Sequence, residues 1–130
     1  MAGTFKFELV TPERIALSED ADRVVVPGIE GSFTVLAGHA PVISVLRPGM
    51  IDVTLPDART TSIYVGGGFA EVDAEHVTVL AEKAYDVSEM DSETISSELE
   101  QAEADLASAA SDAARLAASS AVERLRALQK

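Results

Sequence analysis

Apolar and polar positions alternate with a period of two from Thr4 to about Tyr85, which is the pattern of strands with one buried face. In residues 5–9, large apolar side chains alternate with Lys6 and Glu8. Further short apolar runs predict strands at Arg14–Leu17, Val24–Val26, Ser32–Leu36, Val42–Leu46, Met50–Leu55, Thr60–Val65, Phe69–Val72 and His76–Ala81. Strands this short and this closely spaced predict an all-β sandwich.

Turn signals separate these runs. Pro27-Gly28, His39-Ala40-Pro41 and Pro48-Gly49 interrupt residues 24–50 three times, because proline lacks an N–H donor and glycine permits positive φ. Turns this closely spaced predict a tight antiparallel meander. The run Gly66-Gly67-Gly68 precedes a strand rather than a helix, so it predicts a tight turn or bulge instead of a phosphate-binding loop.

The pattern changes after Tyr85, since no Gly or Pro occurs from Asp86 to Lys130. Ser88 with Asp91 three residues later resembles a capping box at a helix start. Apolar residues then recur at spacings of three and four, which predicts one buried helix stripe. The stripe comprises Ile95, Leu99, Ala102, Leu106 and Ala109.

A second stripe begins out of phase with the first. It comprises Ala118, Val122, Leu125 and Leu128. The phase change favours two helices joined near Ser108 to Asp112, with Ser111 or Asp112 as the second cap. One long helix is the alternative, because no Gly or Pro marks the turn. The expected fold is an all-β sandwich N-terminal domain over residues 1–85 plus a C-terminal α-helical hairpin over residues 86–130.

Composition narrows the function. The net charge is −12, from 22 acids against 10 bases, which argues against nucleic-acid binding and against adhesion to anionic lipid. The chain has no cysteine, so disulfides and thiolate chemistry are excluded and a reducing, cytoplasmic setting fits. No apolar run is long enough for a transmembrane helix, and the start is not expected to be a secretory signal.

The chain offers little chemistry. Its two histidines lack carboxylates at ligand spacing, and no G-x-S-x-G nucleophile elbow occurs. A structural role is the default for both: His76 opens a strand, and His39 lies in a turn where it is also a candidate for an interface. We therefore expect a noncatalytic protein without a metal or cofactor.

The turn-rich segment carries a resemblance to a known family. Val26-Pro27-Gly28, Gly31, Phe33 to Leu36, His39-Ala40-Pro41, Leu46 and Pro48-Gly49 resemble the signature stretch of the epsilon subunit of bacterial F-type ATP synthase. Gly67 to Val72 and Val77 to Ala81 continue it in order. The resemblance covers roughly the first two thirds of the chain, and the acidic, Ala-rich tail matches only in kind.

The resemblance implies a rotor subunit of a proton-translocating ATP synthase, peripheral on the cytoplasmic face of the bacterial plasma membrane. The sandwich would clamp the gamma subunit through one face and the ring of c subunits through one end, so that rotation drives ATP synthesis. Membrane contact would run only through the c-ring. By position, Ser44 would face gamma. The c-ring loops would comprise Thr11, Pro12, Glu30, Gly31, Ser32, His39, Ala40 and Pro41.

For the tail, the resemblance implies helices that reach the alpha and beta subunits of the catalytic head and block ATP hydrolysis. Its basic residues for this role are Arg115, Arg124, Arg126 and Lys130. The alternative is an acidic first helix, with nine acids in residues 86–112, that pairs with a more basic second helix.

Some members of the family bind ATP through the motif I/L-D-x-x-R-A, which residues 90–95 match in part. Asp91 is kept, but Thr94 replaces the arginine that would pair with phosphate, so we expect no ATP sensing. Two other functions stay open from the sequence. One is a free-standing β-sandwich binding module with a helical tail, and the other is an ATP-sensing regulatory domain.

Overall fold

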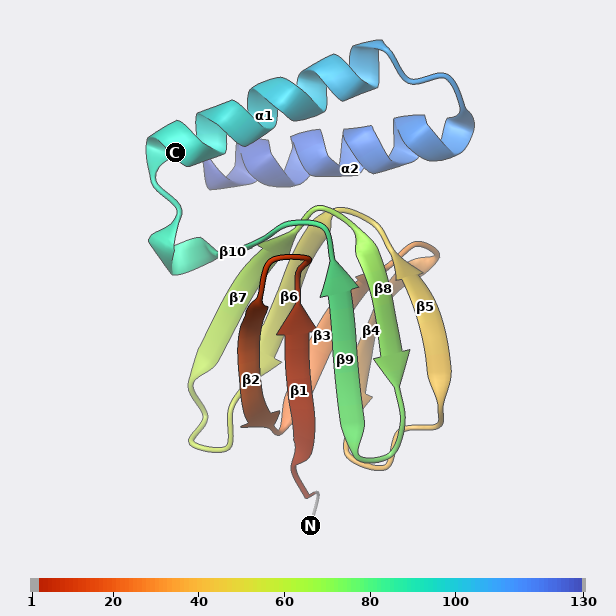
Figure 1. Cartoon of the computed structure of the whole chain (residues 1–130), viewed down its shortest axis with the longest axis vertical. Coiled ribbons are helices and arrows are strands. Elements are labelled where there is room, and N and C mark those ends of the chain that lie inside the picture. The colour runs from red at the N-terminus through yellow and green to blue at the C-terminus, as the bar shows by residue number, and fades with distance from the viewer. Residues whose placement is uncertain (1–2, 130) are drawn as a thin grey trace.

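The computed structural model describes residues 3–129, and in them a helical hairpin lies across one end of a β-sandwich (Figure 1). The strands of this part of the chain are β1 (Phe5–Val10), β2 (Ile15–Ala21), β3 (Arg23–Gly28), β4 (Gly31–Leu36), β5 (Val42–Leu46), β6 (Gly49–Thr54), β7 (Thr60–Val65), β8 (Gly68–Val72), β9 (His76–Ala81) and β10 (Ala84–Asp86). The short 3-10 helix η1 (Val87–Glu89) leads to α1 (Ser92–Ala107) and α2 (Asp112–Leu128). The predicted sandwich plus helical hairpin is confirmed.

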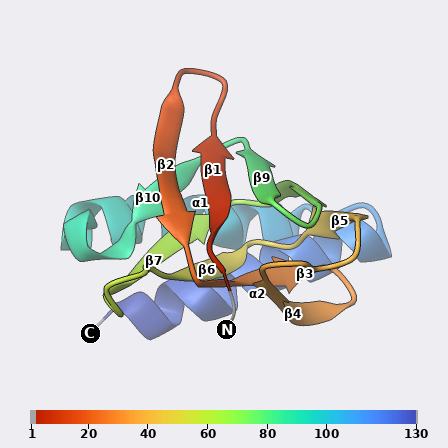
Figure 2. The ribbon, with the colours of Figure 1, turned by 90° about the horizontal axis from the view of Figure 1, so that it is seen from below.

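The strands form two layers that are joined at a corner. One layer runs β2-β1-β9-β8-β5 and the other runs β10-β7-β6-β3, with β4 paired to β3. From below, β1, β2 and β9 lie apart from β3, β4, β6 and β7 (Figure 2). The layers connect through the single bridge between Gly28 and Leu46, at the ends of β3 and β5. Neighbouring strands are antiparallel except β1 and β9, which are parallel.

The predicted meander in residues 24–50 is wrong. Only β3 and β4 form a hairpin there, while β5 pairs along its length with β8 and β6 pairs with β3 and β7. Pro48-Gly49 therefore carries the chain from one layer to the other instead of folding it back within a sheet. The strand β2 is also longer than predicted, because its polar second half continues the pairing with β1 as far as Ala21.

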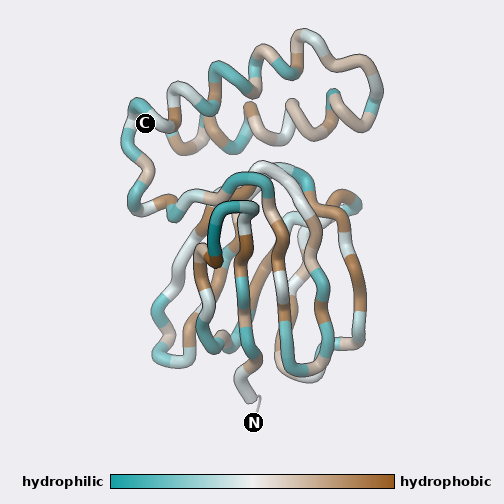
Figure 3. The backbone as a smooth tube through the Cα atoms, viewed as in Figure 1, coloured by the Kyte–Doolittle hydropathy of each residue, from teal (hydrophilic) through white to brown (hydrophobic). Residues whose placement is uncertain are grey.

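Alternating side chains fill the space between the layers. Phe7, Val24, Val26, Ile51, Val53, Val65 and Val79 are at most 1% exposed. Apolar and polar residues accordingly alternate along the strands (Figure 3). The predicted tight turn at Gly66–Gly68 is present between β7 and β8, with φ of +100° at Gly67 and +145° at Gly68.

The hairpin prediction is confirmed, and Ser111 is the cap of the second helix. Its hydroxyl accepts a hydrogen bond from the Ala114 amide at 3.0 Å. The predicted capping box at Ser88 and Asp91 is wrong: Asp91 is itself the N-cap of α1 and Ser88 lies in η1. Asp86 holds that short turn by accepting from the Ser88 amide at 2.9 Å.

The helical hairpin packs against the outer side of β7. The contact forms a second hydrophobic core, separate from the one between the two layers. Tyr64 of β7 is 2% exposed and lies against the buried stripe of the helices. Their residues in this core are Leu99, Ala102, Ala121, Val122 and Leu125. The strand β7 is thus buried on both sides, with Ile63 and Val65 facing the sandwich core. Among residues 3–129, no helix is both long and apolar enough to cross a membrane.

Candidate functional site

The outer surface of β5, β8 and β9 carries large apolar side chains in register. Val45 pairs with Phe69, and Phe69 pairs with Leu80, so the three lie in one row across the strands. Ile43 continues the patch two residues earlier on β5 and is 72% exposed, while Phe69 at its centre is 51% exposed. We call Ile43, Val45, Phe69 and Leu80 the apolar face. A solvent-facing side of an antiparallel sheet is normally polar, so this face needs a cover.

A groove of about 670 Å³ adjoins the apolar face and shares Ile43 and Val45 with it. It is lined by residues 28–33 of the β3–β4 hairpin and by residues 39–45 of the loop into β5 and of β5 itself. The hairpin tip is fixed to β5 because the Ile29 amide donates to the Val45 carbonyl at 2.9 Å. We call this feature the groove.

The groove brings together most of the residues that the resemblance assigns to the c-ring. Glu30, Gly31 and Ser32 lie on one side of it, and His39, Ala40 and Pro41 lie on the other. Ser44, assigned to gamma, also lines the groove and faces the side of β5 opposite to Ile43 and Val45. These positions therefore share one feature of the surface.

Thr11 and Pro12 lie elsewhere. They line a separate cavity with Phe69 and Leu80, at the margin of the apolar face, in the turn between β1 and β2. That turn is on the same end of the sandwich as the hairpin, whereas the connection from β4 to β5 is at the opposite end (Figure 1). The predicted c-ring residues therefore do not all lie at one end of the sandwich. Glu30 to Ser32 lie at the Leu46 end of β5, which is also the end of Thr11 and Pro12 because β1 and β5 run in the same direction. Only His39 to Pro41, which precede β5, lie at the opposite end.

Both histidines contact backbone groups of their own turns. His39 Nδ1 lies 2.7 Å from the carbonyl oxygen of Ala40, and the His39 ring is 6.3 Å from that of Phe33. His76 caps the β8–β9 turn with Asp73, whose carboxylate accepts from the His76 amide at 2.8 Å. Within residues 3–129, no cluster of three potential metal ligands is present.

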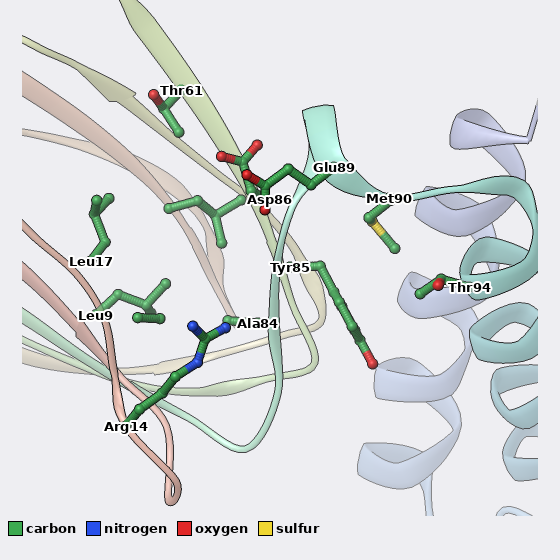
Figure 4. A pocket seen from close by; sticks show the side chains of 12 residues that line it. Leu9, Arg14, Leu17, Thr61, Ala84, Tyr85, Asp86, Glu89, Met90 and Thr94 are labelled. Atoms are coloured by element: carbon green, nitrogen blue, oxygen red, sulfur yellow. The ribbon is translucent and has the colours of Figure 1, made fainter.

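A polar cluster ties α1 to the sandwich. Glu98 of α1 accepts from Lys83 Nζ at 2.8 Å and from the Tyr85 hydroxyl at 2.9 Å. The Glu98 hydrogen bond raises the pKa of Lys83, while burial and then the bond to Glu98 raise the pKa of Tyr85. We call these three residues the clasp. Figure 4 shows Tyr85 pointing from β10 toward the helices.

The partial ATP motif lines a cavity of about 410 Å³ behind Tyr85 (Figure 4). Met90 and Thr94 border it, together with Arg14, Asp86 and Glu89. Asp91 is engaged as a helix cap: its carboxylate accepts from the Thr94 amide at 2.8 Å, which lowers the pKa of Asp91. Thr94 stands in place of the motif's arginine, so the α1 start supplies no cation, and the basic residue among those that line this cavity is Arg14 of the β1–β2 turn.

The basic residues of the tail are partly paired within the hairpin. Arg126 bridges to Glu103 of α1 at 2.9 Å, and Arg115 bridges to Asp112 at 3.2 Å. Arg124 is exposed and forms no ion pair with a described residue, and Lys130 lies outside the described residues. The expected pairing of an acidic first helix with a basic second one thus rests on a single cross-helix ion pair in residues 3–129.

Several of these features were not found from the sequence. The apolar face belongs to predicted strands, but its outward orientation shows only when the layers are assembled. Sequence patterns do not relate the residues of the clasp to one another, because Glu98 is 13 or more positions from Lys83 and Tyr85. The same holds for Arg47 and its partner Ser120. Only Phe69 could have been noticed in the sequence as a candidate surface residue, because it is a large aromatic residue directly after a glycine turn.

Comparison with known proteins identifies the family. Residues 4–87 match the family described as ATP synthase, Delta/Epsilon chain, beta-sandwich domain. The chain is 42% identical over 129 residues to the ATP synthase epsilon chain of Parvibaculum lavamentivorans, covering 99% of this chain and 98% of that one. It is 43% identical over 129 residues to the epsilon chain of Maricaulis maris, covering 99% and 96%.

Solved structures agree. A chain in the Euglena gracilis mitochondrial ATP synthase, in a structure of OSCP/F1/c-ring, superposes with a TM-score of 0.73 at 26% identity, covering 97% of this chain and 79% of that one. A chain in the central stalk/c-ring structure of the Tetrahymena thermophila mitochondrial ATP synthase shares the fold, with a TM-score of 0.63 at 17% identity over 99% and 98% of the two chains. The sandwich with its hairpin, the match over residues 4–87 and the near-complete alignment to bacterial relatives place this chain in the family of ATP synthase epsilon chains.

Proposed function

We propose that this chain is a noncatalytic central-stalk subunit of a proton-translocating ATP synthase, and that it joins the gamma subunit to the c-ring. It is a peripheral subunit at the cytoplasmic face of the bacterial plasma membrane, and its contact with the membrane is through the c-ring. Family membership supports this proposal, as does the presence of a similar chain in a solved F1/c-ring assembly.

The observation that carries the proposal is the apolar face. Ile43, Val45, Phe69 and Leu80 form a continuous exposed patch on strands whose inner sides are already filled by the core. Burial of apolar surface contributes about 25 cal/mol per Å², so a partner that covers such a patch gains binding energy without rearranging the sandwich. An aromatic residue at the centre of an apolar patch is the usual anchor of a protein interface. We assign this face to the gamma subunit.

The groove presents the second docking surface, and we assign it to the c-ring except at Ser44, which the resemblance assigns to gamma. Its walls are short loops that are held by backbone hydrogen bonds, such as the one from the His39 amide to the Leu36 carbonyl at 3.1 Å. Loops that are already ordered lose little entropy on binding. Two docking surfaces on one rigid sandwich allow rotation of the ring to be passed to gamma without slippage.

The tail is assigned a regulatory role within the same proposal. In the hairpin, Arg126 and Arg115 are engaged by acids of the tail itself. For the tail to bind an acidic surface of the catalytic head, the hairpin must therefore leave the sandwich and exchange these partners. The small, Ala-rich seam between the helices favours such a release, because alanine buries little apolar area.

Replacing Phe69 with alanine is expected to weaken binding to purified gamma subunit at least tenfold, about 1.4 kcal/mol, because the aromatic anchor of the apolar face is lost. Binding is measured by calorimetry with the full chain. The matched control is Ile15→Ala, since Ile15 is 60% exposed on β2 and lies outside the face. Circular dichroism verifies that both variants are folded.

The comparison of the two variants decides the proposal. Loss of affinity in Phe69→Ala with unchanged affinity in Ile15→Ala supports the apolar face as the gamma-binding surface. Wild-type affinity in Phe69→Ala contradicts the assignment of this face to gamma. If the wild-type chain itself does not bind gamma, the proposed function is wrong.

A further inference from the structure

Arg47 connects the groove with the helical hairpin. It follows β5, and the two terminal nitrogens of its guanidinium group reach in different directions. Its Nη2 donates to the Ser32 hydroxyl of the groove at 3.1 Å, and its Nη1 donates to the Ser120 hydroxyl of α2 at 3.4 Å. Ser120 in turn donates to the Pro48 carbonyl at 2.7 Å, which fixes α2 to the turn between β5 and β6.

The guanidinium of Arg47 has only neutral partners. It forms no ion pair with any described residue, although the chain carries 22 acids against 10 bases. Arginine forms its stronger, bidentate hydrogen bonds with carboxylates, and such charge-assisted bonds are roughly twice as strong as neutral ones. A carboxylate brought to the groove from outside therefore competes effectively with the two serine hydroxyls.

We propose that Arg47 receives an acidic side chain of the c-ring, which docks in the groove, and that this contact withdraws its guanidinium from Ser120 and loosens α2. The inference rests on the proposed function, because it needs a protein partner at the groove. It adds the chemistry of that partner, a carboxylate beside Ser32, and a link between docking and the position of the hairpin. By thermodynamic reciprocity, release of α2 strengthens the partner's hold on Arg47.

The clasp provides a matched control. Lys83 and Tyr85 hold Glu98 of α1, so they also fix the hairpin to the sandwich, but none of the three lines the groove. Weakening the clasp loosens the hairpin without removing the connection to Ser32. A variant of the clasp therefore shows the effect of a loosened hairpin alone, whereas a variant of Arg47 also removes the link between the groove and α2.

The test uses the full chain with spin labels on two introduced cysteines, at exposed Thr34 of β4 and exposed Ser119 of α2, since the chain has none of its own. Electron–electron distance measurements give the ratio of docked to released hairpin, with and without a saturating amount of a purified gamma–c-ring complex. Binding of that complex is measured separately. The variants are Arg47→Met, Arg47→Lys and Lys83→Met.

In the wild-type chain, binding is expected to lower the docked-to-released ratio about fivefold, which is the net contribution of one typical hydrogen bond. Lys83→Met starts from a looser hairpin but shows the same further decrease. Arg47→Met starts looser and shows no further decrease. Arg47→Lys keeps the charge without the forked geometry, so its response is smaller than that of the wild type.

Two results overturn the inference while leaving the proposed function intact. One is a wild-type hairpin that does not respond although the complex is bound. The other is an Arg47→Met variant that binds and responds as the wild type does. A complex that does not bind the wild-type chain overturns the proposed function, and the inference with it.

Discussion

Replacing Gly68 with alanine is expected to lower the free energy of unfolding by about 4 kcal/mol, among the largest effects of a single substitution. Gly68 opens β8 with φ of +145°, a region that residues with a Cβ rarely adopt. An added Cβ would also overlap the carbonyl oxygen of Leu80 on β9 and lie 3.0 Å from the Ala81 Cα. Both neighbours are backbone atoms in a paired strand, so neither can move without breaking the ladder. Urea unfolding followed by circular dichroism measures the loss.

Gly31→Ala separates backbone strain from overlap. Gly31 has a closely similar φ of +139°, but a Cβ there would meet no atom within 4 Å. Its cost is therefore the conformational strain alone, on the order of 1–3 kcal/mol. Gly68→Ala should exceed it by about 1–3 kcal/mol. Equal losses in the two variants would show that close packing of β8 against β9 contributes nothing at Gly68.

The positions of the strands could be predicted from the sequence because turn residues bound each apolar run. Val42–Leu46, Thr60–Val65 and His76–Ala81 were predicted with their observed bounds. Strand pairing could not be predicted in the same way. The turn at Pro48-Gly49 has the same residues whether it closes a hairpin or carries the chain to the other layer, and only the second layer decides between them.

The alternation of apolar and polar residues also does not determine which apolar side chains are buried. Phe7 and Phe69 both lie in strands of alternating residues, yet Phe7 is fully buried and Phe69 is 51% exposed. The difference arises because the inner side of each layer is covered by the other layer, whereas no second layer of residues 3–129 covers Phe69 on the outer side of β8. An exposed apolar face and a core face thus have the same sequence signature.

The candidate site was predictable only in part for the same reason. The resemblance supplied Glu30 to Ser32 and His39 to Pro41, which the fold gathers along the groove. It also supplied Thr11, which lies at the same end of the sandwich as Glu30 to Ser32 but lines a different cavity. The residues that join the sandwich to the hairpin were missed, because Arg47 and Ser120 are 73 positions apart and no local pattern relates them.

Above pH 10, the folded chain is expected to lose about 2 kcal/mol of stability through Tyr64 alone. Burial beneath the hairpin, with added repulsion from Glu98 and Tyr85, raises the pKa of Tyr64 from 10.0 to about 12. The full difference corresponds to about 2.7 kcal/mol, and we expect somewhat less because Tyr64 lines a cavity open to solvent. Since the folded state keeps this proton longer than the unfolded state, the contribution is complete below pH 10 and is lost as the pH rises through 12.

Urea unfolding at a series of alkaline pH values measures this loss, and the ultraviolet absorbance of tyrosinate follows the titration without interference, because the chain has two tyrosines and no tryptophan. The raised pKa of Lys83 and that of Tyr85 act in the same direction, so the wild-type chain loses more than the share of Tyr64. Tyr64→Phe should flatten the decline between pH 10 and 12, whereas Tyr85→Phe, whose ring is more exposed, should leave most of it. A decline in Tyr64→Phe as steep as in the wild type would mean that the hairpin does not cover Tyr64 in solution, since an uncovered hydroxyl would titrate near pH 10 in both states.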